Sequence, residues 1–90
     1  MNIPEPVPNF FNIYTKSKCT YCTKAKENFP GANIINCDMY WKEDKRKFLE
    51  TMDKLSGKQP RTFPMIFNGM KYIGGFEDTK DLGFNMNTAF

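Results

Sequence analysis

The stretch KSKCTYCTKAK, residues 16–26, holds Cys19 and Cys22, two of the three cysteines in a chain of 90 residues. The segment before it, NFFNIYT (9–15), places apolar side chains on one face at every second position and predicts a strand. Residues 19–29 carry apolar side chains at helical spacing, and a Phe-Pro-Gly sequence ends the helix. Cys19 is therefore expected where a strand gives way to the N-terminus of a helix.

The remainder of the chain alternates between strands and helices. The predicted elements are a strand over ANIINCD (32–38), a helix from about Lys42 to Leu55, a strand over FPMIF (63–67), an antiparallel return over MKYI (70–73) after the Asn-Gly turn, and a short helix from near Phe76. This β-α-β-α-β-β-α order predicts an α/β domain whose first two strands are parallel and connected right-handedly. Residues 1–8, with three prolines, are expected to form an extended leader, and residues 85–90 a loose tail.

Composition excludes several classes of protein. A net charge of +3 is too diffuse to predict binding to nucleic acid. No apolar run approaches the length that spans a membrane, and the N-terminus lacks the charged and apolar regions of a secretory signal. We therefore expect a cytoplasmic protein, or one of another reducing compartment. In such a compartment a close pair of cysteines is more often catalytic or metal-binding than structural.

The position of the cysteine pair predicts a reactive thiol. The exposed amides and the dipole of a helix N-terminus favour a thiolate at Cys19, and Lys16 and Lys18 add positive potential. Cys22, one turn further on and on the apolar face, is expected to be the resolving thiol, which attacks a mixed disulfide formed by Cys19. Two alternatives remain open, half of a zinc site and a structural disulfide. Zinc would need two more ligands, whereas the chain has no His and only Cys37 besides, which we expect in the core.

Thr62-Phe63-Pro64 gives a second, weaker signal. A proline that enters a strand predicts an edge or a special backbone geometry, and a cis peptide bond is one such geometry. A cis Pro64 would leave the N–H and C=O of Phe63 free to pair with an extended peptide. The alternative is an ordinary trans proline at the start of a strand.

Gly74-Gly75-Phe76-Glu77-Asp78 gives a third signal. Two glycines permit a sharp turn and a close approach of the backbone, and the residues after them open a helix. The amides of that helix could hold a carboxylate, and its two acidic side chains could bind an ammonium group. The alternative is a Gly-Gly turn followed by acidic residues that only cap the helix.

Together and in this order, the three motifs resemble the glutaredoxin family of the thioredoxin fold. The matching segments are KSKCTYC (16–22) for the family's K-x-x-C-P-Y-C, RTFP (61–64) for its R-T-V-P, and IGGFED (73–78) for its I-G-G-x-D-D. The likeness covers about residues 10–84. Thioredoxin itself is less similar, because it lacks the G-G-x-D-D element and carries W-C-G-P-C at its active site.

The resemblance implies one glutaredoxin domain over residues 1–90, with a thioredoxin-like fold in which helices flank a four-stranded mixed sheet. It implies that Cys19 is the nucleophile, that Cys22 resolves the mixed disulfide, and that Pro64 is cis. It also implies that glutathione, the co-substrate, lies across the three motifs. The residues assigned in this way to the glutathione site are Lys16, Tyr21, Arg61, Thr62, Phe63, Pro64, Gly75, Phe76, Glu77 and Asp78.

The family's use of these residues implies a role for each end of glutathione. The backbone of Phe63 would pair with its cysteine, and the first amides of the last helix would receive its γ-glutamyl carboxylate. Glu77 or Asp78 would meet its ammonium group. Lys16, helped by Arg61 or Gln59, would reach its glycine carboxylate.

One departure from the family pattern leaves a second function open. Thr20 stands where the family usually has proline, and loss of this proline sometimes accompanies a [2Fe–2S] cluster shared between two subunits and two glutathiones. The first expectation is still a monomeric oxidoreductase without a tightly bound cofactor. Its expected partners are glutathione and disulfide-containing or glutathionylated proteins, of which ribonucleotide reductase is one family possibility.

Overall fold

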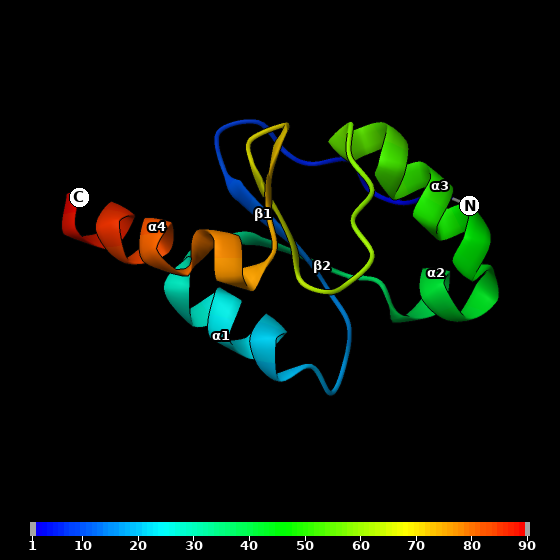
Figure 1. Cartoon of the computed structure of the whole chain (residues 1–90), viewed down its shortest axis with the longest axis horizontal. Helices are drawn as coiled ribbons and strands as arrows, with labels where there is room; N and C mark the ends of the chain where they lie inside the picture. Colours follow the sequence, from blue (N-terminus) through cyan, green and yellow to red (C-terminus); the bar gives the residue numbers. More distant parts are fainter. Residues whose placement is uncertain (1, 90) are drawn as a thin grey trace.

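The computed structural model describes residues 2–89, with side chains described as far as Leu82 (Figure 1). A four-stranded sheet in the order β2-β1-β3-β4 forms its centre. β1 pairs with β2 in parallel, and both β1 with β3 and β3 with β4 are antiparallel. The elements are β1 (Phe11–Thr15), α1 (Thr20–Asn28), β2 (Asn33–Asn36), α2 (Asp38–Glu43), α3 (Lys45–Ser56), β3 (Met65–Asn68), β4 (Lys71–Gly74) and α4 (Phe76–Ala89).

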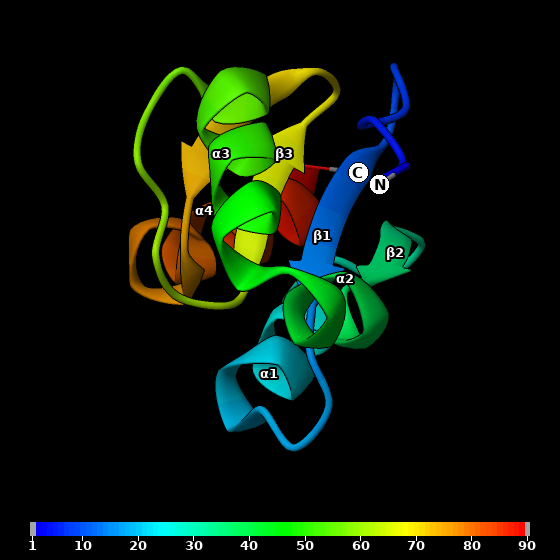
Figure 2. The same cartoon turned by 90° about the vertical axis from the view of Figure 1, so that its right-hand side faces the viewer.

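Alternation of side chains along the strands divides the core into two parts, one on each face of the sheet. On one face, Ile13 of β1 and Ile66 of β3 pack with Ala25 and Phe29 of α1. The opposite face carries the larger cluster, which includes Tyr14, Ile35, Phe48, Met52, Met65 and Phe67. α3 therefore covers one side of the sheet and α1 and α4 the other, and Figure 2 shows α3 in front and α4 behind. The predicted fold class, a mixed four-stranded sheet between helices, is confirmed.

The single helix predicted from Lys42 to Leu55 is wrong, because the structure has two helices there. The backbone at Asp44 leaves the helical region, with φ −157° and ψ 90°. The carboxylate of Asp44 accepts a hydrogen bond from the N–H of Lys47 at 3.1 Å, so that Asp44 ends α2 and caps α3. The predicted helix end is confirmed, since Gly57 adopts the left-handed conformation with φ 71°.

The hairpin is present, but its turn is shifted by one residue. Asn68 pairs with Lys71, so Gly69 and Met70 form the two-residue turn and Asn68 belongs to β3. Gly69 has a φ of 60°, which suits the first position of a type II′ turn.

Within the described residues, two features of the terminal segments were not predicted. The leader is extended but docked: Ile3 is buried in the larger cluster, and the hydroxyl of Tyr14 donates to the carbonyl of Pro4 at 2.5 Å. At the other end, α4 runs to Ala89 where a short helix and a loose tail are predicted. No proline follows residue 64, and a lone Gly83 does not end a helix. Within residues 2–89, no helix is long and apolar enough to cross a membrane.

Candidate active site

Cys19 occupies the N-cap of α1, as the sequence predicts. Its backbone is extended, with φ −122° and ψ 105°, and its sulfur accepts a hydrogen bond from the N–H of Cys22 at 3.2 Å. The first turn of α1 holds no acidic residue. The two cysteines form a disulfide with a Cα–Cα distance of 5.2 Å, and Cys22 is the buried member. The sulfur of Cys19 therefore lies where helix amides would stabilise its thiolate once the disulfide is reduced.

The segment before β3 runs past this sulfur. The peptide bond between Phe63 and Pro64 is cis, which confirms the geometry that the family resemblance implies. The carbonyl oxygen of Phe63 lies 4.0 Å from Sγ of Cys19. In the described part of the chain, the N–H of Phe63 has no hydrogen-bond partner. An extended peptide beside Cys19 could thus pair with both backbone groups of Phe63.

The turn from β4 into α4 brings helix amides to the same place. Gly74 is buried with a φ of 127°, a conformation essentially restricted to glycine. The N–H of Gly75 donates to the carboxylate of Asp78 at 3.2 Å, and Thr79 donates to the carbonyl of Gly75 at 2.8 Å. A Cβ added at Gly75 would lie 3.6 Å from the carbonyl oxygen of Pro64, so the two turns lie close together.

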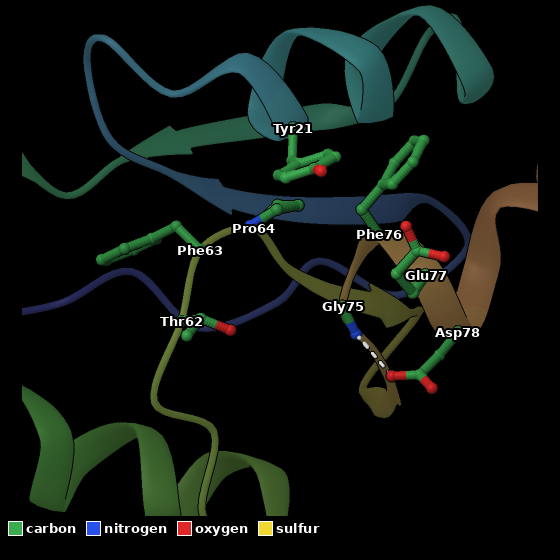
Figure 3. A pocket seen from close by; sticks show the side chains of 8 residues that line it. All are labelled: Tyr21, Thr62, Phe63, Pro64, Gly75, Phe76, Glu77 and Asp78. Atoms are coloured by element: carbon green, nitrogen blue, oxygen red, sulfur yellow. Dashed lines mark hydrogen bonds between the residues drawn. The ribbon is translucent and has the colours of Figure 1, made fainter.

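These three segments enclose a groove of about 370 Å³, which Figure 3 shows from close by. The rings of Tyr21 and Phe76 lie 5.4 Å apart and join the start of α1 to the start of α4. Both rings have polar neighbours, since Lys24 lies over Tyr21 at 5.5 Å and Glu77 follows Phe76. The residues that line the groove are Tyr21, Thr62, Phe63, Pro64, Gly75, Phe76, Glu77 and Asp78, all of them predicted from the sequence.

Neither cysteine lines this groove, and two predicted members of the glutathione site, Arg61 and Lys16, do not line it either. Arg61 turns toward α3, where its guanidinium donates to both carboxylate oxygens of Asp53 at 2.7 and 3.1 Å. This hydrogen bonding lowers the pKa of Asp53 and raises that of Arg61. Lys16 lies closer to the groove, with Nζ 5.9 Å from the centre of the Phe63 ring. Arg61 therefore bonds to α3 and does not line the groove, and its assignment to the glutathione site stays a prediction. The backbone motif gives no information on where a long side chain turns.

Two residues near the site were not predicted to lie there or to act on it. Trp41 of α2 packs edge-on against the ring of Phe63 at 5.4 Å. Asp38 accepts hydrogen bonds from Ser17, in the loop before Cys19, and these bonds lower the pKa of the Asp38 carboxyl. The missed signal for these residues is the first turn of α2, since residues 32–38 are interpreted as one strand from the sequence.

The third cysteine is buried, as predicted. Cys37 has no exposed surface, and burial raises the pKa of its thiol to about 12. It lies at the N-cap of α2 and donates from Sγ to the carbonyl of Ile35 at 3.5 Å. Cys37 therefore belongs to the core and stays protonated under conditions in which Cys19 can react.

Comparison with known proteins identifies the family. A family model described as glutaredoxin matches residues 12–73, which is more than half of the chain. The chain belongs to the glutaredoxin family. This family consists generally of oxidoreductases, and the Cys19–Cys22 pair fits its dithiol motif. Both the family resemblance and the thioredoxin-like fold predicted from the sequence are confirmed.

Individual relatives agree with this assignment. Mitochondrial glutaredoxin-2 of Mus musculus is 35% identical over 74 residues, which are 78% of this chain and 45% of the relative. The chain thus spans less than half the length of this relative. Glutaredoxin of Neisseria meningitidis is 35% identical over 66 residues, which are 73% of this chain and 75% of the relative.

Solved structures give the same fold. The crystal structure of glutaredoxin 1 from Francisella tularensis complexed with cacodylate has a TM-score of 0.71 and 27% identity, and the match covers 87% of this chain and 95% of that one. The buckwheat glutaredoxin–glutathione complex matches with a TM-score of 0.64 and 24% identity, over 90% of this chain and 74% of the other.

Proposed function

We propose that this glutaredoxin is a glutathione-dependent thiol–disulfide oxidoreductase, which reduces protein–glutathione mixed disulfides and protein disulfides. One observation carries the proposal: a groove of about 370 Å³ lies beside the Cys19–Cys22 pair, and the predicted motifs contribute the residues around it. The volume is at the lower end of the range for small-molecule sites and suits an extended tripeptide.

The groups around the groove complement the charges of glutathione. The backbone of Phe63 can pair with the cysteine residue of glutathione and so direct its sulfur toward Cys19. The first amides of α4 can receive the γ-glutamyl carboxylate, while Glu77 and Asp78 supply negative charge for its ammonium group. Lys16 is the cation available for the glycine carboxylate, because Arg61 is held by Asp53.

The reaction consists of thiol–disulfide exchanges. The thiolate of Cys19 attacks the glutathione sulfur of a mixed disulfide, a Cys19–glutathione disulfide forms, and the protein thiolate leaves and takes up a proton. A second glutathione thiolate then attacks the glutathione sulfur, which yields glutathione disulfide and regenerates the Cys19 thiolate. In the dithiol route Cys22 attacks Cys19 instead and releases glutathione, which gives the Cys19–Cys22 disulfide of the structure. Two further glutathiones reduce that disulfide.

The experiment is a glutathione-coupled assay on a glutathionylated peptide and on a protein disulfide. Cys19→Ser is expected to abolish turnover of both substrates. Cys22→Ser should keep activity on the glutathionylated peptide and lose it on the protein disulfide, because only the second reaction needs a resolving thiol. Cys37→Ser is the matched control and should retain both activities. Equal loss of both activities in the Cys19 and Cys22 variants would contradict the mechanism.

The same preparation distinguishes the [2Fe–2S] carrier that Thr20 leaves open. In the described part of the chain no three Cys, Asp or Glu side chains come together as a metal-binding group. Reconstitution with iron, sulfide and glutathione would give a brown dimer with weak reductase activity if the chain is a carrier. A colourless monomer with full activity would support the enzyme.

A further inference from the structure

The loop that joins β1 to Cys19 is held by a carboxylate from another part of the chain. Asp38, at the start of α2, accepts the N–H of Ser17 on Oδ1 at 2.8 Å, and its Oδ2 accepts the hydroxyl of Ser17. The N–H of Asp38 itself donates to the side chain of Asn36 at 3.0 Å, which fixes the carboxylate relative to the end of β2. Ser17 is thus tied by two bonds to a residue 21 positions away.

The residue between this attachment and Cys19 has an unusual backbone. Lys18 has a φ of 56°, in the left-handed region that a residue with a side chain seldom adopts. Such a conformation persists only where the surrounding structure imposes it. The bonds from Ser17 to Asp38 lie directly before Lys18, and the N-cap bond from Cys22 to Cys19 lies directly after it. Lys18 thus lies between two sets of bonds, one at the residue before it and one at the residue after it.

We propose that Asp38 is a positioning residue, which holds the Ser17–Lys18 loop so that the sulfur of Cys19 stays at the start of α1 as a thiolate. It acts through Ser17 and takes no part in the exchange itself. The inference rests on one part of the proposed function, namely that the Cys19 thiolate is the nucleophile.

The charge of Asp38 and its hold on the loop have opposite effects on the acidity of the Cys19 thiol, and this makes the proposal testable. A carboxylate near a thiol disfavours the thiolate, so removal of an Asp38 that acted only by its charge would make Cys19 more acidic. The other charged groups of this region are Lys16 and Lys18, both exposed, and the Cys37 thiol is buried and protonated. If Asp38 acts by position, its removal frees the loop and makes Cys19 less acidic.

The test is the rate of Cys19 alkylation by iodoacetamide as a function of pH, in a Cys22→Ser chain. Cys37 does not compete, because it is buried. Asp38→Ala is expected to slow alkylation by about three- to tenfold at pH values below the thiol pKa, since in that range the thiolate fraction falls tenfold for each unit by which the thiol pKa rises. Asp38→Asn keeps an acceptor for the N–H of Ser17 and should stay within about twofold of the parent. The matched control is Asp53→Ala, which removes a carboxylate of α3 that also accepts two hydrogen bonds but none from the loop before Cys19.

An unchanged or faster alkylation in Asp38→Ala would overturn the proposal. If Asp38→Ala does not fold, Ser17→Ala decides, because it removes the hydroxyl bond and leaves the charge; slower alkylation supports the proposal and an unchanged rate overturns it. The readout uses no glutathione, so failure of the proposed function would leave this result interpretable.

Discussion

Replacement of Gly74 by alanine is expected to damage both the stability and the binding groove. Gly74 ends β4, is buried, and has a φ of 127°. A Cβ at this position would lie 2.7 Å from both Cβ and Oδ2 of Asp78, closer than real Cβ contacts allow. The methyl group must therefore push Asp78 away and break its bond to the N–H of Gly75.

The size of the effect follows from these two costs. A backbone conformation that only glycine adopts readily costs about 1–3 kcal/mol for alanine. The hydrogen bond that is lost adds about 1 kcal/mol. We expect Gly74→Ala to lower the free energy of unfolding by about 2–4 kcal/mol and Tm by about 10 °C or more. Gly75→Ala is the matched control: a Cβ there meets only the Pro64 carbonyl, at 3.6 Å, and should cost less than about 1 kcal/mol.

Urea unfolding followed by Trp41 fluorescence measures both variants. Trp41 is the one tryptophan of the chain and packs against Phe48 and Phe63 at 5.8 and 5.4 Å, so its emission should report loss of the core. The displaced Asp78 should also raise the KM for glutathione in Gly74→Ala. An unfolding free energy of Gly74→Ala within about 0.5 kcal/mol of the parent would refute the reasoning. An equal loss of unfolding free energy in Gly75→Ala would also refute it.

Three further predictions concern single side chains. Asn12 is buried and makes hydrogen bonds to the backbone of residues 7, 10 and 69, so Asn12→Ala should lower the free energy of unfolding by about 2–4 kcal/mol in urea titrations. Lys16→Ala should raise the KM for glutathione several-fold in steady-state kinetics, whereas Arg61→Ala should leave the KM within about twofold of the parent. The reverse order would show that Arg61, and not Lys16, binds the glycine carboxylate. Burial raises the pKa of Cys37 to about 12 in the folded chain, so the thiol of the unfolded chain loses its proton at a lower pH. The free energy of unfolding should therefore fall as the pH rises above about 9. Cys37→Ala should flatten that fall in thermal unfolding between pH 8 and 11.

Much of the fold could be predicted because its local signals agree with the tertiary structure. The alternation in β1, the apolar spacing in α1 and the glycine after α3 each specify an element without help from the rest of the chain. The break at Asp44 was missed because it lies inside a run of charged residues, where a capping aspartate resembles any exposed one. Docking of the leader was not predicted because it depends on the packing of Ile3 against a core formed by distant segments of the chain.

The groove could be predicted from three motifs because backbone features define most of it. A Gly-Gly turn and two helix N-termini follow from the residue types that occupy those positions, and the cis proline follows from the family resemblance. Directions of long side chains do not follow in the same way, and Arg61 shows this by its bonds to Asp53. The contacts of Trp41 and Asp38 depend on α2, a helix of six residues whose sequence has no apolar periodicity that would predict it.

The central claim is that Cys19 exchanges disulfides with glutathione, and the most direct measurement follows the sulfur itself. Cys22→Ser protein is treated with glutathione disulfide, and the modified peptide is identified by mass spectrometry before and after addition of reduced glutathione. We expect one glutathione per chain, attached at Cys19 and removed by reduced glutathione. A chain that acquires no glutathione, or carries it on Cys37, would contradict the account.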